Sequence, residues 1–500
     1  IWLEIPDEVR EVNPYLDHAA ILLRIAVYGL KEGGHNWGER FKIALEAKGI
    51  YCLSLDKGIF VQQRYVNTHE VVRGAHKLNK NWLVEADRKA DCLEGHDIED
   101  VENTYVAGLV VCHVDDTLSS QNQREHFVEG GKAFREDFNA VLAIFEAEST
   151  GEKDQQFLGR VLRIEEAEQG LKISLSMKPH IEALQEVSAT NVLRKLEEKE
   201  RLGERSRFLA AGIHCPFRGA LGQLGWIGKA RIDVPATAGH LASEFGKWAN
   251  AERSSEVLEQ LCEQVNELIR LLKETVEWEK IYTFADSWKG PSPWDRQGPS
   301  PLFVAEVDSG GLCPHRIGSV EQLVGHKKEG DYNFGVENWK LRSGDRMDIT
   351  REIFQEYSIN IVNHFSRAPK RRTSSSTGGE VLAASVGAAT AMHTLSLLKV
   401  LRLVDPREGI MLLTDSGNLL AGAPTEKNLK TDYEQLIELS QSNLLTTAHI
   451  SGKLNVADVL TKNTLENHWL VLPLSGGKKP FRYERVIAER LGIFGTFPTP

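Results

Sequence analysis

The hydrophobic and polar positions of this chain fall into blocks that predict strands and amphipathic helices. Val106–Cys112 is a short and nearly continuous apolar run rich in β-branched residues, which predicts a buried strand. In residues 256–275, leucine and valine recur at helical spacing, which predicts an amphipathic helix whose apolar stripe packs into a core. Apolar runs at Ile281–Ala285 and Gly409–Thr414 predict two further strands, the second covered on both faces. This mixture predicts a protein of the α/β and α+β classes.

The pattern changes along the chain in a way that indicates several domains. A chain of 500 residues is too long for one hydrophobic core. Residues 178–280 are predicted to be mostly helical, with the dense charge of Leu193–Arg207 on a solvated helix or linker. From Lys280 onward strands alternate with helices, and the polar stretch Gly318–Gln355 has the composition of an insertion.

Composition excludes several classes of protein. Hydrophobic residues make up 41% of the chain and charged residues 26%, as in ordinary globular proteins. No apolar run approaches the roughly 18 residues of a membrane span and no signal peptide begins at Ile1, so we expect an intracellular protein, cytoplasmic or nuclear. The six cysteines contain no Cys-x-x-Cys pair, which argues against a zinc module or a disulfide framework. A net charge of −11 argues against nucleic-acid binding, although the basic cluster Arg367–Arg372 offsets it locally.

Two neighbouring carboxylates, Asp115 and Asp116, follow the predicted strand at 106–112. Successive side chains of a strand point to opposite faces, so both acids can approach one site only if the backbone turns there. An apolar strand, two acids and a turn form the kind of hairpin that presents oxygen ligands to a divalent cation. An exposed acidic turn has the same local sequence, and the pair alone does not decide between the two.

Four further carboxylates stand at the ends of predicted elements: Asp286, Glu380, Asp415 and Asp458. Ser374–Thr377 supply N-cap candidates for a long apolar helix, which places Glu380 in its first turn. Ligands gather at the strand ends and helix starts of open α/β sheets. Together the four acids can hold two Mg²⁺ ions roughly 4 Å apart, which clamp the attacking water and the leaving oxygen of a phosphodiester. Mg²⁺ is expected because every candidate ligand is a hard oxygen, with Mn²⁺ as the alternative. Each acid taken singly is also explained as a helix cap or a surface charge.

Short motifs follow one another along the first half of the chain in a fixed order. They are Val27–Lys31 (VYGLK), His113–Asp116 (HVDD), Phe157–Gly159 (FLG), Phe217–Trp226 and Ala230–Asp233 (ARID). In order and spacing these motifs resemble the reverse transcriptase of copia-type retrotransposon polyproteins. The resemblance implies a polymerase palm, an antiparallel sheet with helices on one face, in which Asp115 and Asp116 are the remnant of the metal site for nucleotidyl transfer.

A second series of motifs follows residue 280. It comprises Phe284–Gly290, Ser375–Val381, Asp415–Ser416 and Ala457–Lys462. These motifs resemble the ribonuclease H domain that follows the reverse transcriptase in copia-type elements. The resemblance implies that Asp286, Glu380, Asp415 and Asp458 hold the metals and cut the RNA strand of an RNA–DNA hybrid. It also implies that His449 helps the product to leave, although a single His is more often structural.

The resemblance also implies a domain order and an alternative. It implies a partial reverse transcriptase at 1–190 without its fingers, a helical thumb or connection at 191–278, a ribonuclease H-like α/β domain at 279–465 and a C-terminal tail at 466–500. The family's first palm Asp has no counterpart, because the chain begins at Ile1 partway into the family pattern, so we expect an N-terminally truncated protein without polymerase activity. Gly378 replaces a Glu of the family motif, so a catalytically inactive transposon relic or a domesticated nucleic-acid-binding protein is the alternative. Convergence of the four carboxylates would favour the enzyme.

Overall fold

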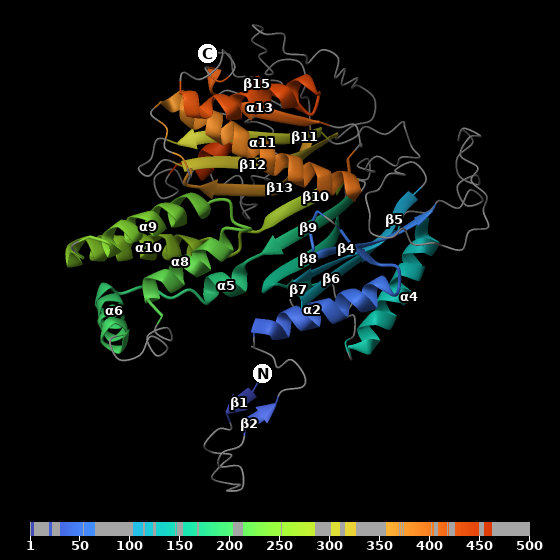
Figure 1. Cartoon of the computed structure of the whole chain (residues 1–500), viewed down its shortest axis with the longest axis horizontal. Coiled ribbons are helices and arrows are strands. Elements are labelled where there is room, and N and C mark those ends of the chain that lie inside the picture. Colours follow the sequence, from blue (N-terminus) through green and yellow to red (C-terminus); the bar gives the residue numbers. More distant parts are fainter. Residues whose placement is uncertain are drawn as a thin grey trace. The chain divides into compact units, whose positions relative to one another are not determined.

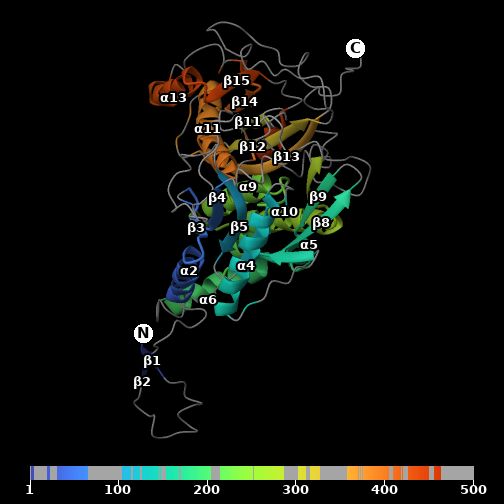
Figure 2. The same cartoon turned by 90° about the vertical axis from the view of Figure 1, so that its right-hand side faces the viewer.

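The computed structural model of the chain (Figures 1 and 2) has a mixed α/β architecture with several antiparallel sheets and helices. The chain divides into two units, Ile1–Gly151 and Glu152–Pro500, which are described separately. Apart from short gaps, the structure describes residues 2–4, 20–22, 31–65, 104–147, 154–203, 214–285, 302–310, 316–326, 357–404, 409–419, 426–449 and 455–462.

The first unit is built on a four-stranded antiparallel sheet in the order β3–β4–β5–β6. Its strands are β3 (Tyr51–Cys52), β4 (Ile59–Tyr65), β5 (Thr104–His113) and β6 (Asp116–Gln121), and its helices are α2 (Lys31–Glu46) and α4 (Val128–Ile144). A separate pair consists of β1 (Trp2–Glu4) and β2 (Ala20–Leu22). Strand β5 contains the apolar run at 106–112, so the prediction of a strand there is confirmed.

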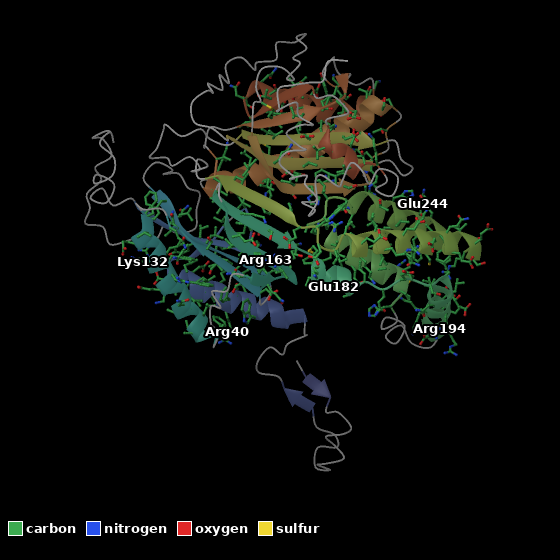
Figure 3. All side chains as sticks on the ribbon, turned by 180° about the vertical axis from the view of Figure 1, so that it is seen from behind. Arg40, Lys132, Arg163, Glu182, Arg194 and Glu244 are labelled. Atoms are coloured by element: carbon green, nitrogen blue, oxygen red, sulfur yellow. The ribbon has the colours of Figure 1, made fainter. Side chains whose placement is uncertain are left out.

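Helix α4 packs tightly on this sheet because β5 has a glycine at the contact. A Cβ at Gly108 would lie 2.2 Å from the ring of Phe134, so any larger residue would push the helix away. The outer side of α4 is charged, and Lys132 there pairs with Glu129 at 2.6 Å (Figure 3). Burial of Phe134 on one side and solvation of Lys132 on the other is the amphipathic arrangement that orients a surface helix.

The second unit begins with a four-stranded antiparallel sheet in the order β10–β9–β8–β7 and a group of helices. The strands are β7 (Asp154–Phe157), β8 (Arg160–Ala167), β9 (Gly170–Ser176) and β10 (Lys280–Ala285). The helices are α5 (Lys178–Glu182), α6 (Ala189–Gly203), α8 (Pro216–Ile227), α9 (Pro235–Ala249) and α10 (Ser255–Glu274). The leucine stripe predicted at 256–275 is confirmed, since Leu258, Leu261 and Leu268 of α10 are buried in this core.

A buried ion pair fastens the turn between α8 and α9 to the end of α10. Arg231 donates from Nε to Asp233 Oδ1 at 2.9 Å and from Nη2 to Asp233 Oδ2 at 2.6 Å. The same guanidinium donates to the carbonyl oxygen of Thr275 at 3.0 Å. Both side chains of the pair are almost fully buried, so every donor must be matched by an acceptor. The Ala230–Asp233 motif therefore has a structural explanation in the packing of these helices.

A five-stranded mixed sheet in the order β13–β12–β11–β14–β15 forms the last part of the second unit. Strands β11 (Leu302–Gly310), β12 (Arg316–His326) and β13 (Tyr357–Arg367) are antiparallel neighbours, and β14 (Ile410–Thr414) and β15 (Leu445–His449) run parallel to β11. The other elements are α11 (Ser376–Val400), α13 (Lys430–Gln441) and the 3₁₀ turns η5 (Lys427–Leu429) and η6 (Val456–Leu460). All five residues of β14 are buried, as predicted for a strand covered on both faces.

Helix α11 packs across β11 and β12 (Figure 2). Gly387 makes this close approach feasible, because a Cβ there would lie 2.3 Å from Cγ1 of Val307. Among the described residues, α11 alone is long and apolar enough to cross a membrane, but half of its apolar window is buried within the protein. Its alanines and leucines belong to the hydrophobic core of the five-stranded sheet, which accounts for its composition.

Two sequence-based expectations need correction here. The predicted strand at 281–285 exists as β10, but it pairs with β9 and not with any strand of the five-stranded sheet. The stretch 318–355, expected to be an insertion, begins within β12, whose residues through His326 are paired in the sheet. Residues 316–323 of this strand are all buried, polar ones included, which explains why composition alone was misleading. Glu321, for example, is buried and accepts a hydrogen bond from Asn363.

Candidate metal centre

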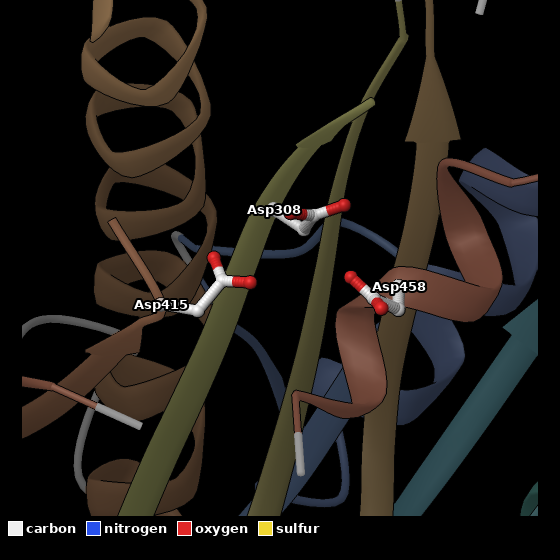
Figure 4. Close-up of side chains that lie close together, drawn as sticks. All are labelled: Asp308, Asp415 and Asp458. Atoms are coloured by element: carbon white, nitrogen blue, oxygen red, sulfur yellow. The ribbon is translucent and has the colours of Figure 1, made fainter. Parts of the chain in front are cut away.

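Three carboxylates of the second unit converge at one edge of the five-stranded sheet. One oxygen from each of Asp308, Asp415 and Asp458 lies within 4.8 Å of the other two, and Figure 4 shows the side chains pointing toward one another. They come from β11, from the residue after β14, and from η6. All three are at least partly buried, which is unusual for acids without a cationic ligand.

The register of two parallel strands brings Asp308 and Asp415 together. β11 and β14 are hydrogen-bonded neighbours in which Val307 is opposite Thr414. The next residue on each strand is an aspartate, so the two carboxylates emerge side by side where both strands run toward their carboxyl ends. This is the edge at which open α/β sheets bind ligands.

Glu380 is the fourth acid of the centre. It lies in the second turn of α11, one turn further from the N-cap than the sequence indicated, and it accepts a hydrogen bond from the backbone N–H of Ser309. Burial, followed by the nearby charges of Asp308, Asp415 and Asp458, raises the pKa of Glu380 to about 9. Its Oε2 is buried and has no hydrogen-bond partner.

The start of α11 is fixed by a cap that was predicted at 374–377. Ser375 is the N-cap residue, and its hydroxyl oxygen accepts from the N–H of Gly378 at 3.0 Å. The same hydroxyl donates to Glu426 at 2.6 Å. Gly378 leaves room for that carboxylate, since a Cβ there would lie 2.6 Å from Glu426 Oε1. The glycine that departs from the family motif therefore belongs to the packing of the helix start.

The acids interact unfavourably with one another. Burial raises the pKa of Asp308 to about 7, the charges of Asp458 and Asp415 act in the same direction, and the hydrogen bond from Thr461 opposes them. Burial, followed by the charge of Asp458, also raises the pKa of Asp415. Carboxylates that are close together and partly withdrawn from water favour a proton or a cation at the site.

One buried amide joins the elements that carry the acids. The side chain of Asn455 caps η6 by accepting from the N–H of Ala457 at 3.1 Å, and it donates to the carbonyl oxygen of Val307 at 3.0 Å. It also hydrogen-bonds Asp415 and thereby favours the charged form of that acid, lowering its pKa. Asn455 is 1% exposed, so the loss of any of these bonds would leave a buried polar group unpaired.

Glu306 provides a second link between β11 and η6. Its Oε2 accepts from the N–H of Val456 at 2.6 Å, and its Oε1 accepts from Nε2 of Gln322 at 2.5 Å. The turn η6 can approach the sheet because β11 and β12 have glycines beneath it. A Cβ at Gly310 would lie 2.5 Å from the carbonyl oxygen of Thr461, and one at Gly318 would lie 2.7 Å from Leu460.

The structure brings together three of the four predicted acids, Glu380, Asp415 and Asp458, and adds Asp308, which the sequence analysis missed. Asp286 lies outside the described residues, and the strand before it belongs to the other sheet. The missed signal is local: Phe303–Val307 is an apolar run interrupted only by Glu306 and is followed by Asp308. It has the same strand-then-acid pattern that indicated Asp415.

The remaining predicted residues are not part of this cluster as far as the structure describes them. The backbone of His449 ends β15 and is opposite Thr414, but its side chain lies outside the described part, so its role stays a prediction. In the first unit, Asp116 begins β6 and is exposed, and Asp115 lies outside the described residues.

The donor set fits a hard divalent cation. All four groups are carboxylates, the ligand type that Mg²⁺ and Mn²⁺ prefer, and the buried Oε2 of Glu380 has an unused acceptor. A comparison with models of known protein families and a search of curated proteins both find no match to this chain. The arguments about function therefore rest on the geometry of the acids and on the motifs.

Proposed function

We propose that this protein is a metal-dependent nuclease of the ribonuclease H type that cuts the RNA strand of RNA–DNA hybrids. The observation that carries the proposal is the convergence of Asp308, Asp415 and Asp458, with Glu380 close enough for their charges to raise its pKa. Four acids at the carboxyl edge of a mixed sheet are suited to hold the two divalent cations of phosphodiester hydrolysis.

The residues of the chain have distinct tasks in this proposal. Asp308, Asp415, Asp458 and Glu380 would hold Mg²⁺, or Mn²⁺ in its place. When bound, the two cations would supply Lewis-acid activation of water and charge stabilisation of the leaving oxygen. Asn455 donates a hydrogen bond to Asp415, and Thr461 donates one to Asp308. These hydrogen bonds would fix the orientation of both carboxylates as metal ligands. Without a cation, the ionised carboxylates of this cluster would repel a phosphate.

We further propose that the whole chain derives from the reverse transcriptase–ribonuclease H region of a copia-type retrotransposon. In this assignment each of the antiparallel sheets β3–β6 and β7–β10 corresponds to part of the polymerase region, α6 to α10 correspond to the connection, and the five-stranded sheet with α11 corresponds to a ribonuclease H-like domain. The order of the motifs supports it, as do the antiparallel pairing of β5 with β6 and the cluster of acids. The binding partner would be an RNA–DNA hybrid or other DNA or RNA.

Cleavage of an end-labelled RNA–DNA hybrid in Mg²⁺ and in Mn²⁺ tests the proposal. Wild-type protein should cut the RNA strand, and Asp415→Asn should reduce the rate by at least about 100-fold, since loss of an outer-sphere partner alone commonly costs 10- to 100-fold. Glu434→Gln is the matched control because it removes an exposed acid from α13, away from the cluster. A folded protein that cuts neither strand would support the catalytically inactive relic instead.

The choice of the fourth acid has its own test in the same assay. Asp308→Asn should abolish cleavage as Asp415→Asn does, whereas Asp286→Asn should keep at least about half of the wild-type rate. The opposite result, with loss in Asp286→Asn alone, would assign the ligand to the position predicted from the motif and refute the assignment from geometry.

A further inference from the structure

A lysine side chain reaches the acid cluster from the residue four positions after Asp458. Nζ of Lys462 contacts Oδ2 of Asp458, across one turn of chain. The side chain of Asp458 is 11% exposed and that of Lys462 is 45% exposed, so the ammonium approaches from the solvent side. The contact therefore lies on the open side of the proposed metal centre.

The charge of Lys462 also affects acids other than its direct partner, Asp458. It opposes the rise in pKa of Asp308 and of Asp415, so its positive charge favours the ionised form of both acids. One ammonium thus interacts favourably with three of the four carboxylates. A divalent cation bound by these carboxylates would have to occupy a region in which Lys462 already supplies positive charge, and the two would repel each other.

Lysine is suited to a contact that must be released. Its charge is carried on a flexible stem with four rotatable bonds, and it binds a carboxylate as a point charge without the two-pronged geometry of arginine. Because Lys462 is almost half exposed, its ammonium can return to water at little cost. By contrast, Asp415 is held in place by a hydrogen bond from Asn455, and Asp308 by one from Thr461.

We propose that Lys462 is an internal competitor of the divalent cation: it neutralises part of the acid cluster in the metal-free protein and is displaced from Asp458 when the metal binds. This inference rests on the proposed metal centre. In this inference Lys462 acts through Asp458 and lowers the affinity of the centre for the metal. Removal of the charge of Lys462 should therefore tighten metal binding and make the metal-free protein less stable.

Calorimetric titration of the full chain with Mn²⁺ alone provides the test. Lys462→Gln should lower the dissociation constant for Mn²⁺ by about 3- to 10-fold, the range expected from an ion pair of moderate strength. Lys462→Arg keeps the charge and can bind Asp458 with two prongs, so it should not bind Mn²⁺ more tightly than wild type. Lys430→Gln is the matched control, because it removes the same charge from an exposed pair with Glu434 on α13, and it should leave the affinity unchanged.

Thermal unfolding in EDTA gives a second readout that does not depend on activity. Without metal, Lys462→Gln should have a lower melting temperature than wild type. When Mn²⁺ is added, the melting temperature of Lys462→Gln should rise by more than that of wild type. Affinity in Lys462→Gln that is equal to or weaker than wild type would overturn the inference. If wild type binds no more Mn²⁺ than Asp415→Asn, the metal centre itself is refuted, so the two failures are distinguishable.

Discussion

Asp308→Asn should make the five-stranded sheet of the metal-free protein more stable at alkaline pH, although it removes a ligand of the proposed metal centre. Asp308 is 5% exposed and faces other acids, and burial raises its pKa from 3.8 to about 7. A buried acid with a raised pKa holds its proton more tightly in the folded than in the unfolded state. Folding is therefore favoured by the protonated acid at low pH and is opposed once the acid ionises.

The expected size of the effect follows from this shift. Stability is lost as the pH rises from about 4, where the unfolded acid ionises, to about 7, where the folded one does. A difference of about 3 pKa units at about 1.4 kcal/mol each corresponds to a loss of about 4 kcal/mol. Asparagine has no charge to bury but accepts less strongly from Thr461, so the variant should gain about 2–4 kcal/mol over wild type at pH 8.5. At pH 4 the two proteins should be equally stable.

Hydrogen exchange of the amides of β11 and β14 in EDTA measures this stability in the relevant domain, independently of the rest of the chain. In the wild type, the protection of these amides against exchange should decrease between pH 4 and pH 8.5. In Asp308→Asn, the decrease in protection should be smaller. Addition of Mn²⁺ at pH 8.5 should restore protection to the wild type but not to Asp308→Asn. A variant that is less stable than wild type by the same amount at both pH values would refute the electrostatic reasoning.

Three further substitutions test a support of the acid cluster, the packing of α11 and the helical propensity of α8. Asn455→Ala removes the cap of η6 and the hydrogen bond to Asp415. It should destabilise the domain by about 2–3 kcal/mol in denaturant unfolding and weaken Mn²⁺ binding at least about 10-fold. Unchanged affinity for Mn²⁺ would contradict the role of Asn455 in positioning Asp415. Gly387→Ala should cost about 1–3 kcal/mol in the same experiment, because the new methyl group meets Val307, and Val307→Ala should relieve part of the loss. Gly222→Ala, in an exposed turn of α8 with open space around it, should instead stabilise by up to about 1 kcal/mol, and destabilisation there would show that helical propensity was misjudged.

Local patterns in the sequence were sufficient to predict several strands and helices and part of the candidate metal centre. The apolar run at 106–112, the leucine stripe of α10 and the buried β14 all appear where they were predicted. Glu380 and Asp415 were identified because each stands next to a strong local signal, a serine-rich helix cap and a fully apolar strand. Such signals depend on neighbours within a few residues, which are visible in the sequence itself.

The sequence by itself therefore determined where β5, α10 and β14 form, and it identified Glu380, Asp415 and Asp458 as candidate acids. Only the tertiary structure decided which strands are neighbours, and through this which acids meet. β10 and β11 both have strand-like sequences; β10 is followed by Asp286, and β11 contains Asp308. However, β10 pairs with β9, whereas β11 pairs with β14. Strand pairing is set by hydrogen bonds and packing between segments far apart in the chain, which leave no local pattern. For that reason Asp308 became visible as a partner of Asp415 only once the register of β11 against β14 was known.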